Sequence, residues 1–226
     1  MKAVILAAGR GVRMMPLTEN TPKPLLKVNS RALIDYTIDL LPKEVSEIIV
    51  IVNYLGDQIT NYLTKNYPSL KFKFIWQKDL SGTYKAVELA KQYLQGEKFL
   101  VLFSDDLHSK SAVAKLAKYD LGIVVAEAEH PERFGVVNLK KNNEIESIEE
   151  KPTKPKSKLV NVGVHILDSR IFDYIPKPHL NGEHYLTDAI AIMLKDFSFV
   201  AITTDFWVPI GYPEDLTRAE EVLNSL

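Results

Sequence analysis

Short continuous apolar runs alternate with amphipathic stretches through the first half of the chain. The runs are too short for ordinary helices and are typical of strands buried on both faces. Predicted strands lie at 4–8, 47–52, 72–76 and 99–103. Predicted helices, with apolar residues at helical spacing, lie at 32–41, 56–63 and 83–94. This βαβαβαβ order predicts an α/β fold with a Rossmann-like, mostly parallel mixed sheet flanked by helices.

The rhythm changes after Tyr119, where strand-like segments follow one another with turn signals between them. The four segments are 121–128, 134–139, 145–150 and 159–167. The chain then returns to a helix at 185–194, a strand at 199–203 and a helix at 213–223. We therefore expect a small, partly antiparallel region beside the ligand site. The composition does not shift sharply anywhere, which favours a single domain over 1–226.

Composition excludes several classes of protein. The chain has 226 residues, a formal net charge of -1 and no cysteine. Near-neutral charge argues against nucleic-acid and anionic-membrane partners, and the lack of cysteine excludes disulfide scaffolds, thiolate catalysis and cysteine zinc sites. The first apolar run is too short for a signal peptide or a membrane span. We expect a cytoplasmic protein and leave a homo-oligomer open.

The most informative stretch is the loop after the first predicted strand. Gly9 and Gly11 allow a close backbone approach to a ligand, and Arg10, Arg13 and Lys23 follow among several prolines. A strand tip that leads into a glycine-containing, cationic loop is suited to phosphates. A dinucleotide fingerprint would need a third glycine where Met14 stands, and no Lys-Ser or Lys-Thr pair completes a P-loop.

The same loop resembles the signature of a known family. The pattern L-A-A-G-x-G-x-R-x-x-P-L-T followed by P-K-P-L is similar to that of sugar-1-phosphate nucleotidyltransferases. The resemblance implies transfer of a nucleotidyl group from a nucleoside triphosphate to a sugar 1-phosphate, with Mg²⁺ as the cofactor and pyrophosphate as the second product. By this resemblance Arg13 and Lys23 act on the triphosphate, and the nucleotide contacts are Leu6, Ala8, Gly9, Gly11, Gln77, Gly82 and Thr83.

Gln77 is the predicted reader of the base. It follows a predicted strand, and Gly82 and Thr83 follow it in a Q-x-x-x-x-G-T spacing that resembles the uridylyl and thymidylyl members of the family. A glutamine amide offers one acceptor and two donors, which can pair with a pyrimidine edge. We favour UTP or dTTP and leave the choice between them open.

Asp105 is the predicted Mg²⁺ ligand, because it follows the strand at 99–103 and carboxylate oxygens suit this cation. Its neighbour Asp106 is either a second carboxylate or a helix cap, and we favour the cap. The family usually carries a second ligand, an Asp, where this chain has Pro209. Asp106, Asp205, or phosphates and water are the alternatives for that second position. The five histidines show no convincing metal spacing.

The sugar-side residues rest on the resemblance. It implies that Glu150 binds sugar hydroxyls, that Lys151 binds the sugar phosphate and acts catalytically, and that Gly135 leaves space for the sugar. Asn161 and Gly163 complete this predicted set. From the residues alone, Glu150 and Lys151 are only a charged strand end before Pro152.

Alternatives to this enzyme remain. The chain shows neither the β-helix of acetyltransferase-fused relatives nor the helical extension of longer thymidylyltransferases, so we expect a minimal, single-function core. Pro209 motivates a second hypothesis, a non-catalytic nucleotide-sugar-binding regulatory protein. A third is a nucleotidyltransferase for another base or for a non-sugar phosphate such as phosphocholine.

Overall fold

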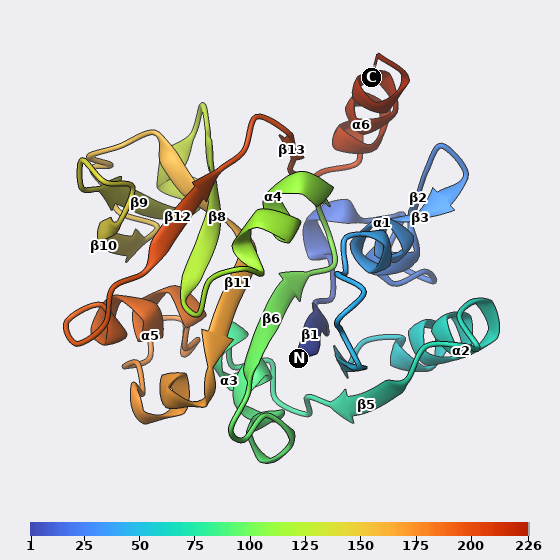
Figure 1. Ribbon diagram of the computed structural model, residues 1–226. Helices are drawn as coiled ribbons and strands as arrows, with labels where there is room; N and C mark the ends of the chain where they lie inside the picture. The colour runs from blue at the N-terminus through green and yellow to red at the C-terminus, as the bar shows by residue number, and fades with distance from the viewer. Residues whose placement is uncertain (226) are drawn as a thin grey trace.

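The computed structural model describes residues 1–225 and is built on a nine-stranded mixed sheet (Figure 1). Its central path is β10-β9-β11-β6-β1-β4-β5, and β8 and β12 join through β11. The strands are β1 (Lys2–Ala7), β4 (Glu47–Val52), β5 (Phe72–Trp76), β6 (Lys98–Phe103), β8 (Gly122–Glu127), β9 (Gly135–Leu139), β10 (Ile145–Glu150), β11 (Leu159–Asp168) and β12 (Val200–Thr203). The helices are α1 (Leu33–Asp39), α2 (Gly56–Asn66), α3 (Thr83–Glu88), α4 (Lys110–Leu116), α5 (Leu186–Met193) and α6 (Glu214–Asn224).

Helices cover both faces of the parallel part of the sheet, which is why its strands are mostly apolar. All six residues of β4 are buried. Ile49 and Ile51 belong to the core under α3 and α5, whereas Ile48, Val50 and Val52 belong to the core under α1 and α2. Successive side chains of a strand point to opposite faces, so one apolar run supplies both cores.

The parallel strands place three predicted site segments at one edge of the sheet. β1 pairs in parallel with β4 and β6, and β4 pairs in parallel with β5. The carboxyl ends of β1, β5 and β6 therefore meet, and they lead into the loop at Gly9, Gln77 and Asp105. Ligands of open α/β sheets bind outside this edge.

The predicted antiparallel region is confirmed, and it continues the main sheet. The long strand β11 pairs antiparallel with β6, β8 and β9, and β9 pairs antiparallel with β10. The register of β11 against β8 shifts between Asn161 and His165. The fold class predicted from the sequence is therefore confirmed, with both regions joined through β11.

Some boundaries differ from the predictions. The helix expected over 83–94 ends at Glu88 and continues only as a short 3-10 helix, Lys91–Tyr93, because the backbone bonds after Val87 span three residues instead of four. The sequence patterns also missed four two-residue strands, which form two small sheets. They are β2 (Lys27–Val28) with β3 (Arg31–Ala32), and β7 (Leu107–His108) with β13 (Trp207–Val208).

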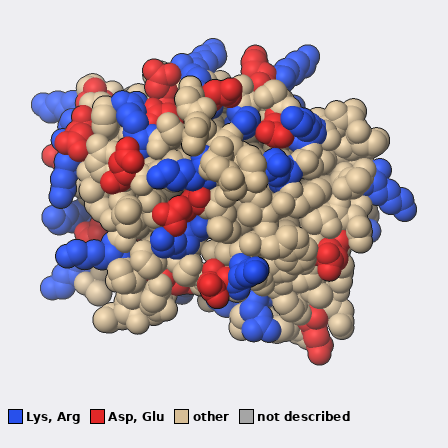
Figure 2. Space-filling view, turned by 90° about the horizontal axis from the view of Figure 1, so that it is seen from below, with Lys and Arg blue, Asp and Glu red and all other residues tan. Residues whose placement is uncertain are grey.

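Acidic and basic side chains are interspersed on the face of the molecule seen from below (Figure 2). This distribution agrees with the formal net charge of -1. Within residues 1–225, none of the helices combines the length and the apolar character that crossing a membrane requires.

Candidate functional site

The loop after β1 is held in place by its own contacts and by residues in and just before α2. Gly11 has a left-handed backbone with φ of +62°, and its carbonyl accepts a hydrogen bond from Thr18 Oγ1 at 2.8 Å. Tyr54 donates its hydroxyl to the Glu19 carbonyl at 2.6 Å, and Gln58 Nε2 donates to the Asn20 carbonyl at 3.0 Å. The loop is therefore a preorganised cradle at the carboxyl end of β1.

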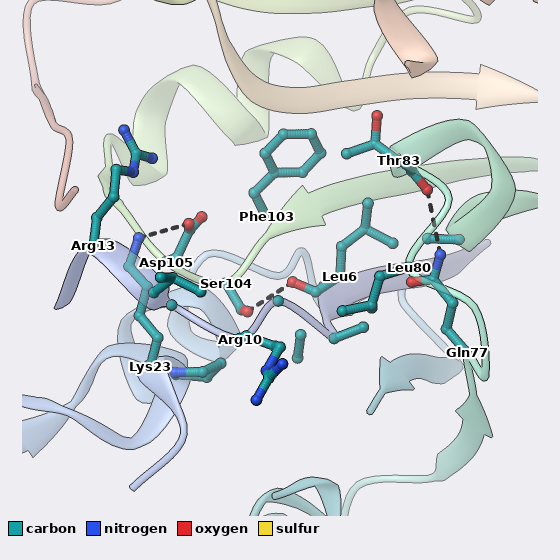
Figure 3. A pocket seen from close by; sticks show the side chains of 18 of the residues that line it. Leu6, Arg10, Arg13, Lys23, Gln77, Leu80, Thr83, Phe103, Ser104 and Asp105 are labelled. Atoms are coloured by element: carbon teal, nitrogen blue, oxygen red, sulfur yellow. Dashed lines mark hydrogen bonds and ion pairs between the residues drawn. The ribbon is translucent and has the colours of Figure 1, made fainter. Parts of the chain in front are cut away.

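Two cations of the loop face the end of β6. Lys23 is at the start of a 3-10 helix, Lys23–Leu25, and its ammonium lies 2.7 Å from Asp105 Oδ2 (Figure 3). Arg13 lies in another 3-10 helix, Val12–Met14, with its guanidinium carbon 5.4 Å from the centroid of the Tyr212 ring. Lys23 thus pairs directly with the Asp105 carboxylate, and the Arg13 charge also favours the ionised form of that group.

Ser104 lies directly after β6 and contacts β1. Its hydroxyl donates to the Leu6 carbonyl at 2.7 Å, which fastens the end of β6 to β1 (Figure 3). The next residue, Asp105, carries a side chain that is 40% exposed, beside the nearly buried Lys23. Burial opposes ionisation of the Asp105 carboxyl, but the Lys23 ammonium outweighs it and holds the pKa of Asp105 below its ordinary value.

Asp106 does not cap a helix, so that prediction is wrong. Helix α4 is capped by Ser109, whose hydroxyl oxygen accepts from Ala112 N at 3.3 Å. Asp106 instead accepts from Trp207 Nε1 at 3.0 Å and from the Ile210 amide at 2.9 Å. Burial and the neighbouring Asp105 charge raise the pKa of Asp106 to about 7. The side chain ties β6 to the segment that carries Pro209.

The carboxylates of the site fit a metal ion whose coordination shell is completed by the substrate. Mg²⁺ usually binds one or two carboxylates plus substrate phosphates and waters. Asp105 is open to the cavity, while both oxygens of Asp106 are already engaged. Asp205 is exposed and does not line either cavity of the site. Over residues 1–225, no group of three or more His, Asp or Glu side chains forms a preformed metal site. Asp105 is thus the residue that could hold Mg²⁺.

A first cavity of about 470 Å³ lies at the carboxyl edge of the parallel strands. Gln77 is 5% exposed, and its Nε2 donates to the Gly82 carbonyl at 3.4 Å. Its own backbone carbonyl accepts from Asn53 Nδ2. The long Nε2 contact leaves the Gln77 amide available to a ligand in the cavity. The cavity is lined by all the predicted nucleotide contacts, Leu6, Ala8, Gly9, Gly11, Gln77, Gly82 and Thr83, and by Arg13, Lys23 and Asp105.

A second cavity of about 440 Å³ shares Arg13, Lys23 and Asp105 with the first. Its other wall contains the predicted sugar-side set, Gly135, Glu150, Lys151, Asn161 and Gly163. Burial raises the pKa of the Glu150 carboxyl, opposed by a hydrogen bond from Thr187 and by the Lys151 charge. The structure therefore brings all predicted site residues to two adjoining cavities, and their chemical roles stay predictions.

Sequence reasoning missed several residues of the site. Phe103, Tyr185 and Gly211 line both cavities, Glu183 lines the first, and Thr187 lines the second. Lys151 Nζ lies 3.4 Å from Tyr185 Oη and 4.6 Å from the centroid of that ring. Tyr185 stands at the start of the predicted helix, where apolar periodicity indicates the helix but not the ligand side.

Comparisons with known proteins agree with this geometry. The family model for nucleotidyl transferases matches residues 2–225. The bifunctional protein GlmU of Methanocaldococcus jannaschii is 38% identical over 226 residues, covering 99% of this chain and 54% of that protein. A bifunctional sugar-1-phosphate nucleotidylyltransferase/acetyltransferase of Sulfurisphaera tokodaii is 34% identical, covering 94% and 53%. The chain spans about half the length of these curated relatives.

A solved structure of a related protein has a similar fold. The structure of a putative glucose-1-phosphate thymidylyltransferase from Bacillus anthracis, in complex with a sucrose, superimposes with a TM-score of 0.87 and 28% sequence identity. The match covers 100% of this chain and 96% of that one. The likeness in fold therefore extends over the length of this chain.

Proposed function

We propose, since this chain belongs to the nucleotidyl transferase family, that it transfers a nucleotidyl group from a nucleoside triphosphate to a sugar 1-phosphate. The products are a nucleoside diphosphate sugar and pyrophosphate. One observation carries the proposal: two adjoining cavities meet at Arg13, Lys23 and Asp105. This arrangement provides two substrate positions with the phosphate-binding charges between them.

The first cavity is the proposed nucleotide site. The backbone around Gly9 and Gly11 accommodates the triphosphate, and Arg13 offers a planar set of donors to its oxygens. Gln77 pairs with the base, and a pyrimidine, UTP or dTTP, suits its acceptor and two donors. The similar structure from Bacillus anthracis is that of a putative glucose-1-phosphate thymidylyltransferase, which supports this choice of base.

The second cavity is the proposed sugar 1-phosphate site. Glu150, which is largely buried, accepts hydrogen bonds from sugar hydroxyls, and Lys151 binds the phosphate. Gly135 is required where it stands, because a Cβ there would lie 2.9 Å from Thr187 Cγ2 and 3.2 Å from Glu150 Oε2. A side chain at this position would fill the space meant for the sugar.

The reaction requires positioning and electrostatic stabilisation. A phosphate oxygen of the sugar 1-phosphate attacks the α-phosphorus, the bond to the β-phosphate breaks, and pyrophosphate leaves with the bonding electrons. Lys151 positions the attacking phosphate, while Arg13 and Lys23 neutralise charge on the triphosphate. Mg²⁺ held by Asp105 would add positive charge at the phosphates. Because Pro209 provides no carboxylate, we assign more of this stabilisation to Arg13 and Lys23.

The test is a measurement of pyrophosphate release over a grid of nucleoside triphosphates and sugar 1-phosphates, with Mg²⁺ and with a chelator. We expect release with UTP or dTTP and one or more sugar 1-phosphates, and loss of release with the chelator. Release with ATP or GTP alone would contradict the assignment of Gln77. Release that survives chelation would contradict the role of Asp105.

A regulatory nucleotide-sugar-binding protein is the second candidate. It is favoured by Pro209, which lies in the second cavity where the family usually has a carboxylate. This candidate predicts binding of nucleotides without pyrophosphate release in any combination of the grid. Release with phosphocholine, and with none of the sugar 1-phosphates, would instead indicate a non-sugar substrate.

A further inference from the structure

The nucleotide side and the sugar side of the site are joined by hydrogen bonds between two loop segments. The His184 amide donates to the Ser81 carbonyl at 2.8 Å, and the Tyr84 amide donates to the His184 carbonyl at 2.9 Å. The Leu186 amide donates to Thr83 Oγ1 at 2.9 Å, across 103 positions of sequence. The segment that follows Gln77 is therefore fastened to the segment that leads into α5.

Gly82 makes this close approach possible. Its φ is +100°, and a Cβ placed on it would lie 2.4 Å from the carbonyl oxygen and 2.6 Å from the amide nitrogen of His184. Such distances are far below van der Waals contact, and the atoms involved are backbone. Any larger residue at position 82 would push the two segments apart.

Thr83 supplies a cap that α5 does not make with its own residues. Tyr185 is the N-cap residue of α5 but makes no side-chain cap within the described chain. The Leu186 amide is one of the unpaired donors at the start of a helix, and the Thr83 hydroxyl accepts from it. The first turn of α5 thus takes its position from a side chain of the nucleotide segment.

The first turn of α5 in turn places the wall of the second cavity. Tyr185 lines both cavities and contacts the ammonium of Lys151 through its hydroxyl and its ring. Thr187 lines the second cavity and hydrogen-bonds Glu150. Thr83 also lines both cavities, at their junction. A continuous series of contacts therefore leads from Thr83 through Leu186 to Lys151 and Glu150.

We propose that Thr83 is a positioning residue for the second substrate. Its hydroxyl holds the start of α5, so that a residue of the nucleotide segment sets the affinity for the sugar 1-phosphate. This inference rests on the proposed function for the identity of the two substrates. It differs from the role expected from the sequence resemblance, in which Thr83 contacts the nucleotide.

The kinetic test uses Thr83→Val, which keeps the shape of the side chain and removes the acceptor. Loss of one net hydrogen bond predicts a rise of about five-fold in KM for the sugar 1-phosphate, with KM for the nucleoside triphosphate changed less than about two-fold. Thr83→Ser should restore the parent value. Ser81→Ala is the matched control, because among residues 1–225 the Ser81 hydroxyl hydrogen-bonds only the Asp79 carbonyl, at 3.3 Å, and the Ser81 carbonyl is retained. A larger effect on the triphosphate, or equal effects on both substrates, would overturn the proposal.

Hydrogen exchange gives a readout that does not need turnover. In Thr83→Val the amides of 184–188 should exchange faster than in the parent chain, while Thr83→Ser and Ser81→Ala should match it. Unchanged exchange in Thr83→Val would overturn the proposal. If the parent chain releases no pyrophosphate, the proposed function fails on its own, and the exchange result alone decides whether Thr83 holds α5.

Discussion

Lys23 and Asp105 form the shorter of the two ion pairs between predicted site residues, the other being Lys151 with Glu150. The Lys23 side chain is only 10% exposed, and its partner lies 2.7 Å away. Removing the Asp105 charge would leave the nearly buried Lys23 ammonium without its partner, and an unpaired charge is costly where it is buried. Asp105 therefore has two roles in the proposed mechanism, to pair with Lys23 and to hold Mg²⁺.

We expect Asp105→Asn to lower kcat for pyrophosphate release by on the order of 100-fold, because the variant keeps the shape of the side chain but removes its charge. Circular dichroism should show a folded protein, and the free energy of unfolding reports any cost at Lys23. Asp39→Asn is the control, because Asp39 pairs with Arg31 in an exposed ion pair. An Asp105→Ala variant with normal Mg²⁺-dependent turnover would contradict the assignment.

At the scale of elements, β11 shows how a strand irregularity shapes the site. Its register shifts between Asn161 and His165, and Gly163 lies within that shift with φ of +83°. A Cβ on Gly163 would lie 2.6 Å from Phe103 Cδ2 and 2.7 Å from Cγ. Phe103 lines both cavities. The glycine thus allows β11 to bend around an aromatic wall of the site.

Gly163→Ala should destabilise the fold by about 2 to 4 kcal/mol, from the left-handed backbone and the overlap with Phe103. Urea unfolding of the two proteins measures this difference. Gly9→Ala is the stability control, because a Cβ at Gly9 meets no atom within 4 Å, and its unfolding free energy should change by less than about 0.5 kcal/mol. Equal stability of Gly163→Ala and the parent would show that Phe103 moves aside without cost.

His165 on the same strand makes the fold sensitive to acid. Both ring nitrogens are buried and, among residues 1–225, lack a hydrogen-bond partner. Burial lowers the pKa of His165 to about 3, well below its unfolded value near 6.5. As the pH falls below 6.5, the unfolded chain binds a proton that the folded chain does not bind. The free energy of unfolding is therefore not reduced by His165 above pH 6.5, and it falls progressively as the pH drops from 6.5 toward 3.

Between pH 6 and pH 4, His165→Phe should reduce the loss of unfolding free energy by about 1 kcal/mol per pH unit. Phenylalanine preserves an aromatic ring beside Phe103, whose centroid lies 5.8 Å from that of His165. Burial lowers the pKa of His108 to about 4, so His108 still makes the unfolding free energy of both proteins depend on pH. His130→Gln, at an exposed histidine, is the control. Identical slopes in the parent and His165→Phe would contradict this account.

Local patterns predicted most of the helices and strands, but they missed the helix α4, Lys110–Leu116. The strands at 47–52, 72–76 and 145–150 have the predicted bounds, and the first of these is buried throughout. Strands β7 and β13 could not be predicted, since each has two residues and exists only through pairing across the fold. Asp106 was misassigned for the same reason. Its partners Trp207 and Ile210 lie 101 and 104 positions away.

At the scale of the whole molecule, the sequence motifs predicted which residues line the site but not how its halves are joined. The phosphate loop, Gln77 and Asp105 follow the carboxyl ends of the parallel strands β1, β5 and β6, so sheet topology alone brings them together. Tyr185 and Glu183 carry no comparable local pattern. They reach the cavities because the segment before α5 bonds to Ser81 and Thr83, a contact that no periodicity indicates.

Nucleotide binding should stabilise the whole molecule, because the first cavity contacts β1, β6 and the start of α3 together. A ligand at about 100 times its Kd adds about 2.7 kcal/mol, which for a chain of this size predicts a rise in Tm of about 5 to 10 °C. We expect this rise with UTP or dTTP and a much smaller one with ATP at the same concentration, measured by calorimetry with Mg²⁺. Gln77→Met should remove the difference between the nucleotides while leaving the phosphate cradle intact. If all four nucleoside triphosphates raise the Tm of the parent chain equally, the first cavity binds the phosphates alone and Gln77 does not select the base.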